Sequence, residues 1–168
     1  MKFCIRIILL GIALFTSCMV KAQAFFNDFE NQNEWNYPWF NLHIIEDNGA
    51  TSENYVCICD SLHDYGLGFG IETRNLTKQS INCKFSFIFK ADAETQADFV
   101  ISIDDTIRNR YWTAYPLANF IDSTSEWSSF LIDLNIPLNY TKDAEIKGYI
   151  WNKASETLYF DNAQLIVE

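Results

Sequence analysis

Residues 80–91 read Ser-Ile-Asn-Cys-Lys-Phe-Ser-Phe-Ile-Phe-Lys-Ala, and this stretch decides the fold class. Side chains of opposite character alternate along it, with Cys83, Phe85, Phe87 and Phe89 on one side and Lys84, Ser86 and Lys90 on the other. A period of two over so long a run is typical of a β-strand with one buried face. The stretch therefore predicts a sheet that covers an apolar core.

The same alternation returns on both sides of this stretch. We expect Phe99 and Ile101 to join Phe85 and Phe87 in the core. The remaining strands are expected at residues 25–30, 55–60, 66–73, 97–105, 110–117, 127–134, 146–152 and 157–167, with a broken aromatic edge or loop at 35–42. About nine short strands without helical periodicity predict one antiparallel β-sandwich over residues 25–168, because a parallel sheet would show continuous apolar strands and intervening helices.

Three glycines interrupt the expected strand at residues 66–73. They alternate there with Leu67, Phe69 and Ile71. Small residues on one face of a strand permit the close approach of another backbone or of a ligand. Farther along the chain, the segment 146–152 places Lys147, Tyr149 and Trp151 on the face away from the core.

The first 24 residues differ from the rest. Lys2 and Arg6 flank an apolar run at 5–15, and an A-x-A-like step follows at 22–24. This pattern predicts a secretory signal peptide, because the apolar run is shorter than the roughly 20 residues of a transmembrane helix. The mature protein is expected outside the cell or in its envelope. Cleavage near Ala22 or Ala24 would leave it soluble, whereas the lipobox-like residues before Cys18 would give a lipid anchor there.

Charge excludes one class of partner. All 22 acidic residues follow residue 24, and three of the 12 basic residues lie in the signal segment. The mature chain therefore has nine basic against 22 acidic residues, a net charge of −13. Nucleic acid and anionic membranes are disfavoured, because phosphate binding needs clustered Lys and Arg. A neutral ligand or a bound cation suits this surface.

Cysteine usage leaves several interpretations open. Cys57, Cys59 and Cys83 remain in the mature chain, and they are odd in number. They serve either as small apolar core residues or, in an oxidising compartment, as a disulfide from Cys57 or Cys59 to Cys83. A metal site is a third alternative.

Motifs for catalysis are missing from the sequence. It holds no G-x-S-x-G elbow, no H-E-x-x-H and no phosphate-binding glycine loop. Asp104 and Asp105 are adjacent acids that read as a solvated turn after a strand. The sequence therefore predicts a protein that is not an enzyme.

The two ends of the domain carry a family resemblance. Residues 26–30 (FNDFE), the Trp151-Asn152 pair and residues 158–165 (LYFDNAQL) resemble the galactose-binding-like jelly rolls, including carbohydrate-binding modules of exported Bacteroidetes proteins. The resemblance implies a jelly-roll sandwich whose terminal strands lie side by side, with a structural calcium ion near them. Its implied ligands are Glu30 and Asp161, with Asp28 as a substitute. Asn162 departs from the pattern, and Asp161 alternatively accepts backbone N–H bonds without a metal.

A sugar-binding platform is the second hypothesis. Tyr149 and Trp151 share one outward face with Lys147, and Trp112 follows Arg110 on another expected strand. Exposed aromatic rings stack on the apolar faces of sugars, so these five residues are the candidate ligand-binding residues. The alternative is that loops cover them and they belong to the core. We therefore expect a non-catalytic glycan-binding module, with a structural or adhesive cell-surface protein that binds a protein partner as the alternative.

Overall fold

The computed structural model describes residues 22–75, 80–92, 94–105, 107, 109–122, 126–137 and 144–168. Residues 1–21, which hold most of the expected signal segment and Cys18, lie outside this part. The strands are β1 (Gln23–Asn27), β2 (Trp39–Phe40), β3 (Ile44–Glu46), β4 (Tyr55–Cys59), β5 (Tyr65–Glu72), β6 (Ser80–Lys90), β7 (Asp98–Asp104), β8 (Asn109–Pro116), β9 (Ser128–Pro137), β10 (Glu145–Trp151) and β11 (Leu158–Val167). Three 3-10 turns accompany them, at Gln32–Glu34, Thr73–Asn75 and Leu117–Phe120.

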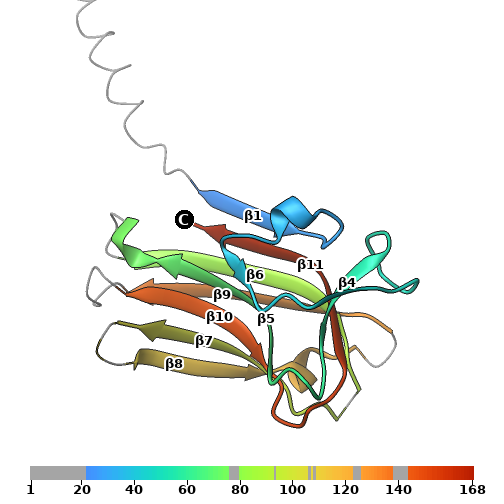
Figure 1. Ribbon diagram of the computed structural model, residues 1–168. Coiled ribbons are helices and arrows are strands. Elements are labelled where there is room, and N and C mark those ends of the chain that lie inside the picture. Colours follow the sequence, from blue (N-terminus) through green and yellow to red (C-terminus); the bar gives the residue numbers. More distant parts are fainter. Residues whose placement is uncertain are drawn as a thin grey trace, which may run out of the picture.

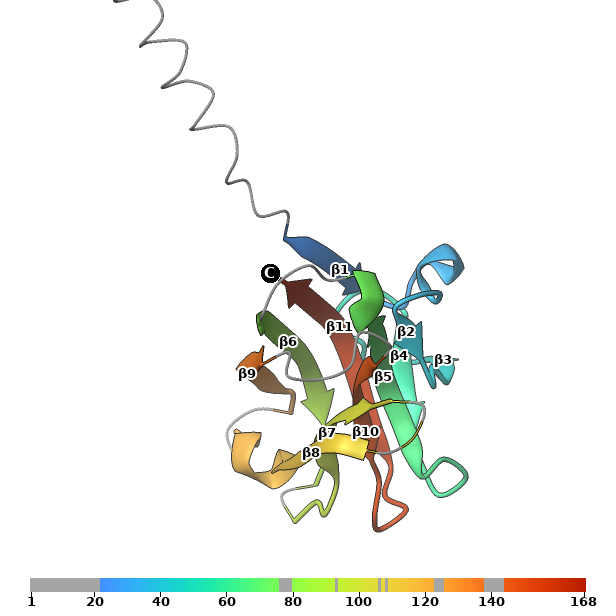
Figure 2. The same ribbon diagram turned by 90° about the vertical axis from the view of Figure 1, so that its left-hand side faces the viewer.

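Two antiparallel sheets face each other (Figures 1 and 2). The six-stranded sheet has the order β3-β4-β11-β6-β9, with β1 also paired to β11, and the five-stranded sheet has the order β2-β5-β10-β7-β8. The predicted antiparallel β-sandwich is thus confirmed. Strand β3 was not expected, because three residues are too few to show a period.

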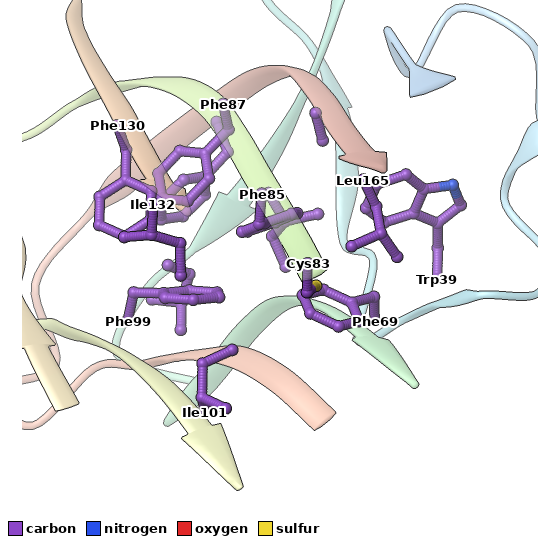
Figure 3. Close-up of a cluster of buried hydrophobic side chains, with 14 of the residues drawn as sticks. Trp39, Phe69, Cys83, Phe85, Phe87, Phe99, Ile101, Phe130, Ile132 and Leu165 are labelled. Atoms are coloured by element: carbon purple, nitrogen blue, oxygen red, sulfur yellow. The ribbon is translucent and has the colours of Figure 1, made fainter. Parts of the chain in front are cut away.

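Aromatic rings from both sheets fill the space between the layers (Figure 3). Phe85, Phe87, Phe99 and Ile101 are buried, as predicted. Phe85 of the six-stranded sheet stacks on Phe99 of the other at 4.8 Å between ring centroids. Such ring contacts between the sheets pack the two layers against each other.

The cysteines are buried apolar residues. Cys57, Cys59 and Cys83 are free thiols in the core. Burial raises the pKa of Cys57 and Cys83 to about 12 and that of Cys59 to about 11. The thiols are therefore neutral and unreactive at physiological pH.

Strand β11 is shared along one edge by two short strands. β1 pairs with the end of β11, from Ala163 to Val167, and β4 pairs with its start, from Leu158 to Phe160. At the junction lie Asp161 and Asn162, where the pairing with β6 on the other edge shifts register. The side chain of Asp161 is completely buried there.

The signal boundary and the first strand overlap. β1 begins at Gln23, so Gln23 and Ala24 pair with Val167 and Ile166 although the sequence analysis assigned both to the signal segment. In the part of the chain that the structure describes, no helix has the length and apolar character needed to cross a membrane.

Candidate functional site

An open groove runs over the outer face of the five-stranded sheet. Its volume is about 280 Å³. The lining residues come from β2, β5, β7 and β10 and from the turn after β2: Phe40, Asn41, Tyr65, Ser102, Asp104, Lys147 and Tyr149. Two of the five candidate ligand-binding residues, Lys147 and Tyr149, therefore line one groove.

Alternation along β10 produces this arrangement. Ile146, Gly148 and Ile150 point into the core, so Lys147 and Tyr149 point outward, as predicted. On the same outer face, the neighbouring strand β5 carries Gly70 opposite Lys147 and Gly68 opposite Tyr149, which leaves room above the sheet for a ring.

That ring is Phe40, which the sequence analysis did not select. A Cβ on Gly68 would lie 2.6 Å from Cε2 of Phe40, and one on Gly70 would lie 3.6 Å from its Cε1. The two outward glycines thus let Phe40 of β2 lie against β5. Gly66 differs from the expectation: it faces inward, where a Cβ would lie 2.8 Å from Cβ of Cys59.

Two aromatic pairs lie on the outer face of this sheet. Tyr65 and Tyr149 meet edge to face at 5.7 Å between centroids, and Trp112 and Trp151 do so at 6.3 Å. Tyr65 is 50% exposed and Trp112 is 49% exposed. Tyr149 and Trp151 are half-buried. The surface is therefore neither a flat exposed pair nor a buried core cluster, and its most accessible rings are those of Tyr65 and Trp112.

Charged groups occupy the far end of the groove. Beyond Lys147 and Asp104, a second hollow of about 440 Å³ is also lined by Glu72, Arg74 and Glu145. Nζ of Lys147 lies 3.1 Å from Oε2 of Glu145 and 4.0 Å from Oδ2 of Asp104. Arg74 forms an ion pair with Glu72. Each cation of this end is thus paired with a carboxylate of the same chain.

One candidate residue cannot be placed in the site. Arg110 belongs to β8, but its side chain lies outside the described part of the structure. Trp112, two residues later, pairs with Ser102 of β7. The tryptophan therefore lies on a strand that β7 separates from β10.

The residues implied as calcium ligands lie elsewhere, in the six-stranded sheet, where β1 ends and β4 begins along the central strand β11. Oδ2 of Asp161 accepts hydrogen bonds from the backbone N of Thr51 at 2.9 Å, from its Oγ1 at 2.7 Å and from the backbone N of Ser52 at 2.8 Å. Oδ1 of Asp161 accepts one from the backbone N of Asn162 at 2.7 Å. The carboxylate is therefore surrounded by donors.

Glu30 has the same kind of environment. Its Oε1 accepts hydrogen bonds from Oγ of Ser52 at 2.9 Å and from the backbone N atoms of Glu53, Asn54 and Tyr55 at 3.1, 2.8 and 2.9 Å. Partial burial raises the pKa of Glu30, but these hydrogen bonds together lower it below its usual value. The ionised form is favoured.

Asp28 does not join the two carboxylates as a ligand. Its Oδ1 accepts a hydrogen bond from the backbone N of Glu30 at 3.1 Å, which closes a local turn. In the described residues no group of three or more His, Cys, Asp and Glu side chains is arranged to hold a metal ion. The donors around Glu30 and Asp161 do not fit a calcium ion, which needs a shell of six to eight oxygens directed at it.

The aromatic positions that the sequence analysis missed had weak signals. Tyr65 directly precedes the glycine-rich strand, and Phe40 follows Pro38 in a broken stretch. Only the pairing of Phe40 with Gly68 across β2 and β5 brings that ring to the groove. A two-residue strand gives no periodicity from which such a pairing could be deduced.

Comparisons with known proteins identify the fold. No family model and no curated protein matches the sequence. The CBM22-2 xylan-binding domain of Paenibacillus barcinonensis Xyn10C matches the structure over 84% of this chain and 97% of its own, at 16% identity and a TM-score of 0.53. A family 16 carbohydrate-binding module matches over 79% and 87%, at 15% identity and a TM-score of 0.46. The predicted jelly-roll type of β-sandwich is confirmed at the level of the fold.

Proposed function

We propose that the outer face of the five-stranded sheet binds a glycan. The observation that carries this proposal is the groove that Phe40, Tyr65 and Tyr149 share with the polar groups of Asn41 and Lys147. Sugars present apolar C–H faces and hydroxyl groups side by side, so a receptor needs rings and hydrogen-bonding groups within one groove. Ligand sites in proteins commonly combine an apolar lining with a few polar groups in this way.

Each group has a distinct role in this proposal. The rings of Tyr65 and Tyr149, which line the groove, and the exposed ring of Trp112 contact sugar faces at two points of the sheet. Nζ of Lys147 and the side-chain amide of Asn41 donate hydrogen bonds to hydroxyl oxygens, and the carboxylate of Asp104 accepts them. The similar fold of a solved structure that is described as a xylan-binding domain supports a glycan as the ligand.

The proposed activity is binding without catalysis. The acids of the groove are engaged within the chain: Glu145 and Asp104 lie beside Lys147, and Glu72 is paired with Arg74. Such groups position and solvate a neutral ligand.

Removing a ring should weaken glycan binding. We expect Tyr149→Ala and Trp112→Ala each to lower the affinity for a glycan identified on an array by at least about tenfold, because truncated aromatic contacts dominate binding energy. Isothermal titration calorimetry on the mature domain measures the change. Tyr159→Ala is the matched control, since Tyr159 is a half-buried tyrosine on β11, in the other sheet.

Two results would contradict the glycan proposal. One is a mature domain that binds nothing on a broad glycan array although it is folded. The other is equal loss of affinity in the Tyr149, Trp112 and Tyr159 variants. Either result would favour the alternative, a structural or adhesive surface protein with a protein partner.

We also propose that the domain is exported and cleaved after Ala22. The start of β1 at Gln23 supports this position, because cleavage there keeps the whole strand. Mass spectrometry of the protein from its native host should give Gln23 as the first residue. A lipid-modified Cys18 would instead establish a lipoprotein, and an intact Met1 in the exported fraction would contradict cleavage.

A further inference from the structure

Five consecutive backbone N–H groups, four from the β3–β4 loop and one from the first residue of β4, point at two carboxylate oxygens. Those of Thr51 and Ser52 reach Oδ2 of Asp161. The next three, from Glu53 to Tyr55, reach Oε1 of Glu30. The hydroxyl groups of Thr51 and Ser52 add one donor to each carboxylate.

Converging backbone N–H groups create a region of positive potential. Successive N–H groups in a turn form a concave anion site, known as a nest. A calcium site has a negative potential instead, because carboxylate and backbone carbonyl oxygens direct their lone pairs at the ion. The donors of this loop occupy the lone pairs of Oε1 of Glu30 and Oδ2 of Asp161, the two oxygens that face the loop.

We infer that residues 51–55 form an anion-binding nest that two carboxylates of the same chain fill, and that this contact takes the place of a structural cation. We call this contact the carboxylate clasp, which consists of Glu30, Asp161 and the loop 51–55. It does not depend on the proposed glycan site, which lies on the other sheet. The calcium ion implied by the family resemblance does not fit these residues.

The carboxylate clasp lies where the pairing along one side of β11 passes from β4 to β1. β1 ends and β4 begins beside each other along β11, and between them Asp161 pairs with neither strand, although it pairs with Ile88 of β6 on the other side. The loop that the clasp holds covers this junction. Glu30 follows β1 and Asp161 lies in β11, so the clasp joins the first and last strands to the loop that leads into β4.

The untreated mature domain provides the first test. A calcium ion that binds only the folded state would raise the melting temperature by roughly 5–10 °C at a hundredfold excess over its Kd. We expect instead the same melting temperature, within about 1 °C, in excess calcium chloride and in excess chelator. A rise with calcium or a fall with chelator would overturn the inference.

Chemical rescue tests whether the loop binds an anion or a cation. Glu30→Ala should lower the melting temperature, and sodium acetate should restore part of the loss where sodium chloride of equal ionic strength does not, since an acetate ion can occupy the emptied half of the nest. Calcium chloride should give no such restoration. Glu53→Ala is the matched control, because Glu53 contributes only its backbone N–H to the clasp and its side chain is exposed.

The outcomes distinguish an anion nest filled by carboxylates from a cation site. Equal restoration by acetate and chloride in Glu30→Ala would be a general salt effect and would contradict a site shaped for a carboxylate. A Glu53→Ala variant as unstable as Glu30→Ala would show that the loss comes from loop disruption rather than from the missing carboxylate. Restoration by calcium would support a cation site and contradict the clasp.

Discussion

Phe87→Ala is expected to lower the free energy of unfolding by about 3–5 kcal/mol. Phe87 lies at the centre of an aromatic cluster, where it stacks on Phe130 at 4.6 Å between centroids. Its other ring contacts are with Phe85, Phe89, Phe99 and Phe160. Truncation leaves a cavity that so many rigid rings cannot collapse to fill, so the cost lies at the high end for a core residue.

Equilibrium denaturation in urea measures the effect on Phe87. Leu131→Ala is the matched control, because Leu131 lies on the neighbouring strand β9 but is 63% exposed. The control should change stability by less than about 0.5 kcal/mol. A loss below about 1 kcal/mol in Phe87→Ala would mean that this face of β6 is not the centre of the core.

Period-two alternation made the sandwich predictable. In β6 and β10 each outward side chain follows an inward one, so single residues could be assigned to a face from the sequence alone. Gly148 fits this pattern, because a Cβ there would lie 2.3 Å from Cε1 of Phe69 and 2.8 Å from Cζ of Phe99. The inward-facing Gly148 thus makes room for two large rings. The alternation predicted that this residue faces inward, but it could not predict that Phe69 and Phe99 lie against it.

The groove was only partly predictable, because it depends on pairing between strands. Lys147 and Tyr149 could be placed on one outward face from their spacing. Their neighbours Phe40 and Tyr65 come from segments about 80 to 110 positions earlier in the chain, and cross-strand register alone brings them together. A sequence shows which face a residue takes on its own strand, but not which strand lies beside it.

The clasp shows a second limit. The family resemblance assigned Glu30 and Asp161 to one shared site, and in the structure both carboxylates do bind the same loop. What the residues could not show was the direction of the loop's backbone. Its N–H groups, rather than its carbonyl groups, face Glu30 and Asp161. This direction decides between an anion nest and a cation site, and no side-chain pattern encodes it.

Asp161→Asn provides the second large expected effect. The substitution keeps the size of the side chain but replaces one acceptor oxygen by an NH₂ donor. If the amide oxygen takes the place of Oδ2, the NH₂ group faces the backbone N–H of Asn162; in the other orientation it faces the N–H groups of Thr51 and Ser52. Either way at least two donors are left without an acceptor at a site that is 0% exposed.

A buried polar group without a partner costs about 1–3 kcal/mol, so we expect Asp161→Asn to lower the free energy of unfolding by about 2–6 kcal/mol. Urea denaturation at neutral pH measures this loss. Asp133→Asn is the control, since the carboxylate of Asp133 forms only an exposed ion pair with Lys84 at 3.4 Å and should contribute less than about 1 kcal/mol.

Because an amide retains one acceptor, a calcium ligand shell would tolerate asparagine at Asp161 when calcium is in excess. Loss of stability that is the same with and without calcium therefore identifies the donors of the loop, and not a metal ion, as the partners of this carboxylate. Equal stability of the Asp161 and Asp133 variants would contradict the hydrogen-bonded environment on which the clasp rests.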